Sequence, residues 1–349
     1  MTASPPGLDL GRLRAYLDEH QPGFATGELA AEVVVGGKSN LTYILGTGDR
    51  RWVLRRPPLG HVLATAHDMT REYRVMTALG ATTVPVPDTH FLCTDPDVIG
   101  APFYAMEYVD GAIYRRGSDT TSLAPARAQA IADALVDVLA DLHDVDPATV
   151  GLADFGRPEG FMARQLKRWH TQLDASRSRS LPGMDELADA LAADVPLSGP
   201  AGIVHGDYRL DNVIVGSDDR VSAVLDWEMA TLGDPLADLG LLLVYWGALA
   251  GLPGAPISSA VDPAVGFPSG EELIARYAAR RSVDLTRLPW YVAFGFFKLA
   301  VISEGIHYRF TAGQTVGAGF EHMGDVVVPL VAKGREALAG DAAGHNKEA

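Results

Sequence analysis

The sequence has almost no cysteine and no excess of basic residues. Cys93 is its only cysteine, so the chain can form neither an internal disulfide nor a zinc site built from several thiolates. This usage predicts a reducing, cytoplasmic setting. Lys and Arg together number 29 against 44 for Asp and Glu, which gives a formal net charge of -15. A nucleic-acid-binding protein would carry a basic surface, so we expect no nucleic acid among the partners.

The sequence also lacks a long hydrophobic run. Its most apolar stretch, residues 239–252, is too short to span a bilayer and predicts a buried helix. Residues 1–10 have no basic segment followed by an apolar core, so we expect no secretory signal and no membrane partner. The composition is 47% hydrophobic and 21% charged, as in ordinary globular proteins. The length fits a two-lobed protein, which we expect to be a monomer or a homodimer.

Residues 1–105 show the pattern of a small antiparallel sheet. Apolar residues recur at helical spacing over residues 8–20 and 66–79, which predicts two helices. Runs rich in β-branched and aromatic residues, separated by turn residues, predict strands. Five such strands are expected, at residues 31–35, 41–45, 51–54, 91–94 and 103–108.

Residues 112–340 are predicted to be mostly helical. Asp234-Pro235 is a strong helix start, with Asp as the N-cap and Pro at the first helical position. The small, polar residues 341–349 predict a disordered tail. The expected helices of this half cover residues 125–143, 160–179, 184–193, 235–250, 271–281, 290–309 and 320–338.

One polar stretch in this half combines residues of phosphoryl-transfer chemistry. His205-Gly206-Asp207-Tyr208-Arg209-Leu210-Asp211-Asn212 follows an apolar run, and a predicted hairpin then leads to Asp226-Trp227. We expect this loop and the strand end to bring Asp207, Asn212 and Asp226 close together. An Asp that accepts a proton, beside oxygen ligands for Mg²⁺, suits phosphoryl transfer. The structural alternative is that Asp211 or Asn212 caps a turn.

The loop Gly36-Gly37-Lys38-Ser39-Asn40 has two interpretations. It is a hairpin turn, since Gly and Asn tolerate positive φ, or it is a flap over nucleotide phosphates. In the second case Gly37 allows close backbone approach, and Ser39 or Asn40 donates hydrogen bonds. A phosphate-binding P-loop is excluded because position 32 is Glu rather than Gly, and because the loop joins two strands instead of opening a helix.

The sequence resembles the aminoglycoside phosphotransferase family, the small-molecule branch of the protein-kinase-like fold, and within it the subgroup fused to acyl-CoA dehydrogenases. The resemblance covers residues 25–330. It implies an α+β, protein-kinase-like two-lobe fold, with an antiparallel five-stranded N-lobe carrying one helix (1–105), a hinge (106–111) and a mostly helical C-lobe (112–340). The motifs that carry it are residues 36–43, 52–57, 106–111, 205–212 and 226–227.

The resemblance implies roles for the polar stretch. Asp207 would accept or orient the proton of the acceptor hydroxyl, and Asn212 and Asp226 would hold Mg²⁺. Arg209 would contact the γ-phosphate. The alternative for Arg209 is a structural ion pair with Asp211 or Asp234.

The resemblance also implies a nucleotide site in the N-lobe. The family commonly has Lys on the third strand, where this chain has Arg55, a larger and forked cation. Arg55 is expected to bind nucleotide phosphates with Glu72 as its partner; Arg56 competes for the first role, and Glu28 or Glu32 for the second. The backbone of the hinge, from Met106 to Val109 and including Glu107, would recognise the adenine edge.

The remaining predicted site residues are supporting or acceptor-binding. His205 and Asp238 are expected to hold the catalytic loop rather than take part in chemistry. Lys298, Glu304 and Arg309 are candidates for the acceptor site, where the family places part of its pocket. Their alternative is a solvated helix face.

The predicted function is therefore an ATP- or GTP-dependent, Mg²⁺-dependent transfer of the γ-phosphoryl group to a hydroxyl of a small molecule. The negative net charge is compatible with aminoglycosides. The basic segment 160–179 instead suits an anionic acceptor such as a hydroxyacyl-CoA, so antibiotic resistance does not follow from the family. The alternative function is a non-catalytic, pseudokinase-like nucleotide-binding protein, which Arg55 in place of Lys would favour.

Overall fold

The computed structural model describes residues 4–34, 40–48, 50–59, 68–197, 199–248, 260–315 and 319–345, without the side chains of 341–345. The chain forms two compact units, one of Met1–Gly111 with Ser222–Ala230 and one of Ala112–Val221 with Thr231–Ala349. The predicted C-lobe of 112–340 is wrong in one respect, because Ser222–Ala230 belongs to the first unit. The backbone explains this, since Val224 N–H donates to Pro85 O at 2.8 Å.

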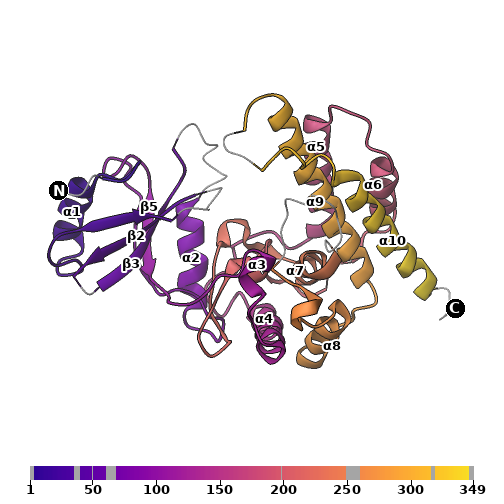
Figure 1. Ribbon diagram of the computed structural model, residues 1–349, viewed down its shortest axis with the longest axis horizontal. Coiled ribbons are helices and arrows are strands. Elements are labelled where there is room, and N and C mark those ends of the chain that lie inside the picture. The colour runs from indigo at the N-terminus through magenta and orange to yellow at the C-terminus, as the bar shows by residue number, and fades with distance from the viewer. Residues whose placement is uncertain are drawn as a thin grey trace. The chain divides into compact units, whose positions relative to one another are not determined.

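The first unit is built on an antiparallel sheet (Figure 1), which confirms the predicted five strands. The strands lie in the order β1-β2-β3-β5-β4, so β5 inserts between β3 and β4. They begin and end within a few residues of the prediction. Their bounds are β1 Ala30–Val33, β2 Leu41–Thr47, β3 Arg50–Arg56, β4 Thr89–Cys93 and β5 Phe103–Glu107.

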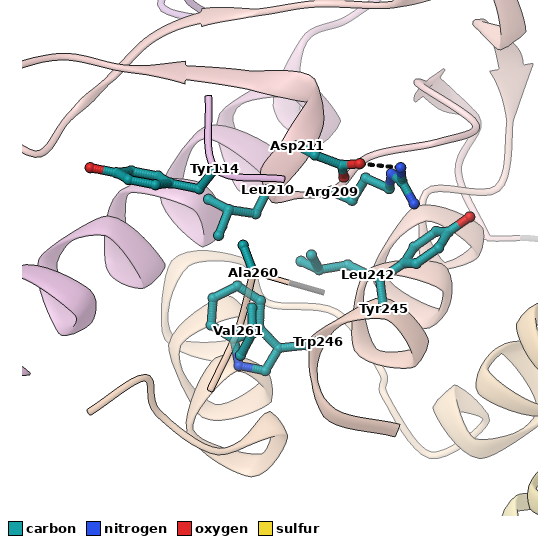
Figure 2. Close-up of a pocket in the computed structure, with 9 residues that line it drawn as sticks. All are labelled: Tyr114, Arg209, Leu210, Asp211, Leu242, Tyr245, Trp246, Ala260 and Val261. Carbon is teal, nitrogen blue, oxygen red and sulfur yellow. Dashed lines mark hydrogen bonds and ion pairs between the residues drawn. The ribbon is translucent and has the colours of Figure 1, made fainter. Parts of the chain in front are cut away.

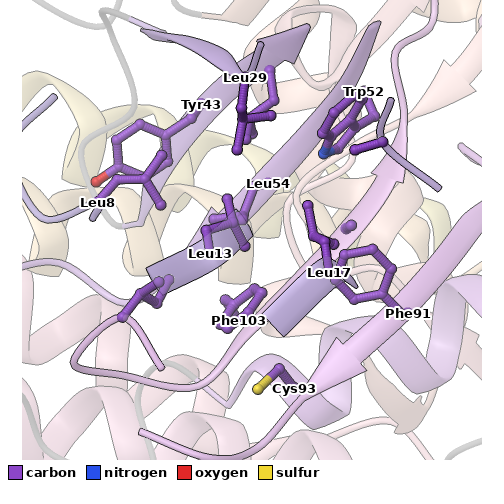
Figure 3. Close-up of a cluster of buried hydrophobic side chains, with 14 residues drawn as sticks. Leu8, Leu13, Leu17, Leu29, Tyr43, Trp52, Leu54, Phe91, Cys93 and Phe103 are labelled. Carbon is purple, nitrogen blue, oxygen red and sulfur yellow. The ribbon is translucent and has the colours of Figure 1, made fainter. Parts of the chain in front are cut away.

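The two faces of this sheet carry different side chains. Because successive residues of a strand point to opposite faces, the pairs Tyr43 with Leu54 and Leu45 with Trp52 share one face. That face forms a buried apolar cluster with α1 (Leu10–His20) (Figure 3). Arg55 and its partner Tyr104 lie on the other face, where they meet α2 (Met69–Leu79).

The α2 helix begins later than expected. Its N-cap is Asp68, whose Oδ1 accepts the Arg71 N–H at 3.1 Å, and residues 66 and 67 lie outside the described residues. The cap fixes which face α2 presents to the sheet. Glu72 is therefore buried, with 1% of its surface exposed, and it lies beside Arg55 rather than in solvent.

The second unit is mostly helical and contains two short strands that pair. β6 (Gly202–Val204) is antiparallel to β9 (Thr231–Gly233), a three-residue strand too short for the sequence pattern to reveal. α9 contacts α5, α6, α7 and α10. The other bounds are α3 Gly117–Thr120, α4 Pro125–Asp144, α5 Phe161–Ser176, α6 Met184–Ala193, β7 Val213–Val215, α7 Leu236–Leu243, α8 Gly270–Arg280, α9 Leu288–Thr311 and α10 Val327–His345. The strand β8, Val221–Val224, begins with the last residue of the segment Ala112–Val221 and otherwise belongs to the first unit.

Two predicted helices differ at their ends. α7 stops at Leu243 and continues as a π-helical turn over Val244–Ala248, whereas an α-helix was expected to residue 250; residues 249 and 250 lie outside the described part. α10 starts at Val327 and runs to His345. The tail predicted to be disordered from residue 341 is thus helical as far as His345, because its alanines favour a helix.

The crossing of α7 and α9 positions the polar stretch. Gly240 allows it, because a Cβ at this position would lie 2.7 Å from the backbone carbonyl carbon of Tyr291. The Tyr291 hydroxyl donates to Asp234 Oδ2 at 2.6 Å, and Asp234 Oδ1 caps α7 by accepting the Leu236 N–H. No helix in the described ranges is long and apolar enough to cross a membrane.

Candidate active site

The polar stretch forms a loop between β6 and β7 whose backbone is held from α7. Asp238 is buried and accepts the N–H groups of His205 and Gly206 at 2.6 and 2.8 Å. His205 Nδ1 accepts the Asp207 N–H at 3.2 Å. Gly206 has a φ of 86°, in the left-handed region that favours glycine. Asp238 and His205, the two predicted supporting residues, therefore both bind backbone N–H groups of this loop. We call it the catalytic loop (residues 205–212).

A buried histidine orients Asp238. His143, at the end of α4, lies with Nε2 3.4 Å from Asp238 Oδ2 and Nδ1 2.7 Å from the Tyr277 hydroxyl. Burial lowers the pKa of His143, so the imidazole is neutral and can donate to the carboxylate. Burial would raise the pKa of Asp238, but the bonds from His143 and the Gly206 N–H outweigh it and lower that pKa.

Asn212 fixes the Asp207 carboxylate. Its Nδ2 donates to Asp207 O at 2.8 Å and to Asp207 Oδ2 at 3.1 Å. Both amide hydrogens therefore point to Asp207, and the amide oxygen is the atom that can bind a cation. Two of the residues predicted to act together are brought together here.

Arg209 is engaged within the loop. It forms an ion pair with Asp211, its Nε lies 3.9 Å from Asp207 Oδ2, and its Cζ lies 4.4 Å from the ring centre of Tyr245. The structure thus contains the ion pair with Asp211 that was the alternative to a phosphate contact. Burial raises the pKa of Asp211 to about 6, with a further contribution from Asp207.

A small pocket opens beside this pair (Figure 2). Its empty space, open solvent included, is about 290 Å³. The ion pair of Arg209 and Asp211 forms one edge, and apolar side chains form most of the remaining wall. The lining residues are Tyr114, Arg209, Leu210, Asp211, Leu242, Tyr245, Trp246, Ala260 and Val261.

Tyr245 is a site residue that the sequence reasoning missed. It lies in the π-helical turn after α7, and such turns are frequent at functional sites. Burial raises its pKa, and the negative charge of the nearby Asp207 carboxylate contributes. In the sequence Tyr245 is one aromatic residue within an apolar run, and nothing in the helical spacing distinguishes it from a core residue.

The predicted acceptor residues occupy three different environments. Lys298 Nζ donates to Gly206 O at 2.8 Å and lies 5.6 Å from the Trp169 ring centre, so it braces the catalytic loop; burial lowers its pKa. Glu304 is fully buried in a two-bond ion pair with Arg179. The acceptor role predicted for Glu304 is therefore wrong. Arg309 lies on an exposed face of α9, as the alternative described.

The first unit contains a buried ionic cluster around Arg55. Arg55 Nε lies 3.2 Å from Glu72 Oε2, and its Nη2 lies 2.5 Å from Asp226 Oδ1 and 3.8 Å from Glu228 Oε2. Burial alone would lower the pKa of Arg55, but Tyr104 and the Glu72 and Asp226 carboxylates raise it, so Arg55 is charged. The competing Arg56 instead donates to the carbonyls of Gly7 and Ile99.

Asn40 and Glu228 complete this cluster, which we call the Arg55 cluster (Asn40, Arg55, Glu72, Tyr104, Asp226 and Glu228). Asn40 Nδ2 donates to Glu72 Oε1 at 2.9 Å and to Glu228 Oε2 at 3.2 Å. These bonds differ from the phosphate contact predicted for Asn40. Gly37 and Ser39 lie outside the described residues. Glu228, two residues beyond Asp226, could have been found as a second carboxylate in the Asp-Trp-Glu sequence.

Asp226 has an unusual backbone. Its φ and ψ are 68° and 56°, a left-handed conformation that residues other than glycine seldom adopt and that clusters at functional sites. Among the described residues no three His, Cys, Asp or Glu side chains form a metal-binding group. Mg²⁺ usually needs only one or two carboxylates and keeps several waters. The Asp226 carboxylate in the first unit and the Asn212 amide oxygen in the second are, each by itself, ligands of the type that Mg²⁺ takes.

The predicted hinge residues lie at the C-terminal end of β5 and just beyond it. Glu107 pairs with Trp52 of β3, and its N–H donates to Asp88 O at 2.8 Å. That N–H is therefore engaged within the first unit. Val109 follows β5 and precedes Gly111, whose φ is 155°.

The basic segment around α5 is partly neutralised. Arg164 donates to the carbonyls of Glu159 and Arg157. Arg177 pairs with Asp185, and Arg179 pairs with Glu304. Carbonyls are neutral, so Arg164 keeps its charge, whereas the charges of Arg177 and Arg179 are offset. The charge that motivated an anionic acceptor is therefore smaller than the sequence indicates, and it resides in Arg164, Lys167 and Arg168.

Comparison with known proteins identifies relatives over most of the chain. The chain is 37% identical to acyl-CoA dehydrogenase family member 11 of Rattus norvegicus over 334 residues, which covers 94% of this chain and 43% of the relative. The chain thus spans less than half the length of that relative.

Solved structures match over nearly the whole chain. A candidate aminoglycoside phosphotransferase of Ralstonia eutropha is 35% identical with a TM-score of 0.81, covering 94% of this chain and 98% of that one. A thermostable mutant of aminoglycoside phosphotransferase APH(4)-Ia, in complex with ADP and hygromycin B, is 15% identical with a TM-score of 0.58. That match covers 87% of this chain and 94% of the other, and it shows the fold alone.

A family model supports the same assignment. The model of the phosphotransferase enzyme family (APH) matches residues 30–289, a range that includes the Arg55 cluster, the catalytic loop and α7. Together with the kinase-like fold, this match confirms the predicted resemblance. The chain belongs to the phosphotransferase enzyme family, whose members are kinase-type enzymes.

Proposed function

We propose that this chain is a Mg²⁺-dependent phosphotransferase that moves the γ-phosphoryl group of ATP or GTP to a hydroxyl of a small molecule. The observation that carries the proposal is the catalytic loop, in which Asn212 holds the Asp207 carboxylate at 3.1 Å. Asp238 holds the backbone of the same loop. A carboxylate fixed in this way can orient an acceptor hydroxyl and take its proton as the oxygen attacks phosphorus.

In this proposal Arg55 contacts the nucleotide phosphates from its place beside Glu72, and Asn212 and Asp226 are the Mg²⁺ ligands. Mg²⁺, when bound, supplies positive charge that offsets the charge of the phosphates. Arg209 stabilises the transferred group once its ion pair with Asp211 opens. The ADP in the APH(4)-Ia complex supports an adenine nucleotide, and GTP is tested beside ATP.

For the acceptor we propose a small hydroxy compound with an anionic group, such as a hydroxyacyl-CoA. Lys167 and Arg168 support it, since their charges can meet an anion. The name of the rat relative, an acyl-CoA dehydrogenase family member, supports acyl-CoA chemistry. Hygromycin B in the APH(4)-Ia complex supports an aminoglycoside acceptor instead, which the same experiment tests.

The test is a coupled assay of ADP and GDP release with a panel of acceptors that includes hydroxyacyl-CoA compounds and kanamycin. Asp207→Ala is expected to lower turnover by about 10²–10⁴-fold, the contribution of a positioned general base, while nucleotide affinity stays within a few-fold. The exposed Asp218→Ala in the same unit is the control. Unchanged turnover in Asp207→Ala would remove this residue from the role, and efficient phosphorylation of kanamycin would defeat the anionic acceptor.

The same experiment separates a non-catalytic nucleotide-binding protein. Such a protein would gain thermal stability from MgATP or MgGTP because the ligand binds only the folded state. It would nevertheless release no ADP or GDP above the level of Asp207→Ala with any acceptor.

A further inference from the structure

The side-chain amide of Asn40 is oriented by carboxylates. Asn40 lies next to β2 with 4% of its surface exposed, and its Nδ2 bridges Glu72 Oε1 and Glu228 Oε2 at 2.9 and 3.2 Å. The opposite orientation of the amide would set its oxygen against two carboxylates, which are acceptors only. The placement of the nitrogen is therefore fixed by its surroundings.

This orientation determines what else Asn40 can bind. Both amide hydrogens are engaged, and the atom left over is Oδ1, which is buried and accepts no hydrogen bond from the described part of the chain. Phosphate oxygens are also acceptors, so Oδ1 cannot bond to a nucleotide phosphate. A contact from Nδ2 to phosphate would require Asn40 to leave a buried carboxylate.

The Asn40 amide affects Arg55 indirectly, because the two carboxylates that it joins, Glu72 and Glu228, also lie beside the Arg55 guanidinium. Glu72 receives Asn40 on Oε1 and both Arg55 and Tyr104 on Oε2, so its two oxygens face opposite sides of the cluster. Glu228 lies 3.8 Å from Arg55 Nη2, whereas Asp226 lies at 2.5 Å. By holding Glu72 and Glu228 together, Asn40 sets which carboxylate the guanidinium can reach.

We infer that Asn40 is a positioning residue, which holds Glu72 and Glu228 so that Arg55 faces the nucleotide site, and is not a ligand of the phosphates. This inference rests on the proposed function, because Arg55 is taken there as the phosphate-binding cation. It assigns to Asn40 an effect on turnover that passes entirely through Glu72 and Arg55.

The test is a double-mutant cycle of Asn40→Ala with Glu72→Gln, with two readouts. One is the Kd of ADP without Mg²⁺, and the other is kcat for MgATP turnover. Asn40→Ala is expected to raise the Mg²⁺-free Kd and to lower kcat by about tenfold each, as for the loss of a hydrogen bond to a charged group, because both readouts depend on Arg55. The double variant is expected to be no slower than Glu72→Gln alone, because residues that act as one unit are not additive.

Two further variants keep the result interpretable. Asn40→Ser retains a small polar side chain if the alanine variant folds poorly. Tyr104→Phe removes the other neutral donor to Glu72 and leaves Glu228 untouched, so it is expected to lower kcat less than Asn40→Ala. Losses in Kd or in kcat that multiply in the double variant, instead of staying at the level of Glu72→Gln alone, would show that Asn40 acts independently of Glu72, as a direct phosphate contact does, and would overturn the inference. A wild-type protein that binds no nucleotide would instead overturn the proposed function, and the inference with it.

Discussion

The two units hold their important carboxylates by different means. In the Arg55 cluster, a single guanidinium contacts Glu72, Asp226 and Glu228. In the catalytic loop, Asp238 accepts two backbone N–H groups, and Asn212 fixes Asp207. An ion pair can be opened by a competing cation, whereas backbone hydrogen bonds keep their partners when a ligand binds.

This difference separates a part that changes on ligand binding from a part that is preorganised. If Asp226 binds Mg²⁺, its short contact with Arg55 must lengthen, and Arg55 then becomes available to phosphates. The backbone of the catalytic loop and the Asp207 carboxylate need no such exchange, since they are held by Asp238 and Asn212. Within this loop only the Arg209–Asp211 ion pair would have to open. Preorganised groups act without reorganisation at the moment of reaction, which suits the proton-accepting role that we propose for Asp207.

The largest expected effect comes from removing the cation of the Arg55 cluster. Arg55→Met leaves buried carboxylates without their shared partner, which typically destabilises a protein by about 3–5 kcal/mol. Mg²⁺ is expected to restore part of this loss, because it can take the place of the guanidinium beside Asp226. Denaturant unfolding of the first unit with and without Mg²⁺ measures both effects.

Arg56→Met is the matched control for this experiment. Arg56 is the next residue on β3, is buried, and donates to the carbonyls of Gly7 and Ile99. Its loss removes the donor to three carbonyls, those of Gly7, Pro57 and Ile99, and strands no carboxylate, so we expect a cost of about 1–3 kcal/mol with no response to Mg²⁺. Equal responses of the two variants to Mg²⁺ would contradict the role given to Asp226.

The second effect tests the backbone anchor of the catalytic loop. Asp238→Asn replaces one acceptor oxygen by an NH₂ group that faces a backbone N–H, so a buried donor loses its partner at a cost of about 1–3 kcal/mol. Mg²⁺ is expected to restore none of it. The measurement is the urea midpoint with and without Mg²⁺, and recovery in Mg²⁺ would mean that the loop is not preorganised as described.

The third expected effect is a dependence of the free energy of unfolding on pH, which His143 causes. Its pKa is lowered in the folded state by burial, so the unfolded chain binds a proton more readily. Stability is therefore constant above the unfolded pKa of about 6.5 and falls as the pH drops below it, with a slope of at most about 1.4 kcal/mol per pH unit. The Asp238 pKa is also lowered, but that carboxylate contributes only below the unfolded Asp pKa of about 3.9, outside this window.

Urea unfolding between pH 7.5 and 5.5 measures this dependence. His143→Gln keeps a side chain that can donate to Asp238 but cannot titrate, so the part of the slope due to His143 is expected to vanish. A wild-type slope that persists in the variant would assign the proton uptake to another histidine.

The sequence predicted well those features that depend on local pattern. The strands of the sheet follow from alternating runs, and the family pattern placed Arg55 beside Glu72 although 16 residues separate them in the chain. Asp238 was expected to hold the catalytic loop, and it accepts two of the N–H groups of that loop.

Features that depend on distant partners could not be read in this way. Glu304 was predicted as an acceptor residue because the sequence of α9 does not reveal that its carboxylate is buried and paired with Arg179. Likewise, the segment around Asp226 follows the catalytic loop in sequence but belongs to the first unit. Tyr245 lies in the π-helical turn that follows α7, where a helical wheel drawn at constant spacing does not describe which side each residue faces.

The smallest expected effect concerns Tyr245, which tests whether the catalytic loop needs more than its backbone anchors. Tyr245→Phe keeps the ring beside Arg209 and removes only the hydroxyl, whose pKa responds to the nearby Asp207. We expect kcat to fall by about 2–10-fold, equal to one hydrogen bond of roughly 0.5–1.5 kcal/mol, with the urea midpoint almost unchanged. Tyr245→Leu also removes the ring, and a cation–π contact of about 0.5–1 kcal/mol with it, so kcat should fall further. If both variants turn over as fast as the wild type, Asp238 and Asn212 alone are sufficient to hold Asp207. The catalytic loop would then need only its hydrogen bonds and no help from the Tyr245 side chain, in clear contrast to the ion pairs of the Arg55 cluster.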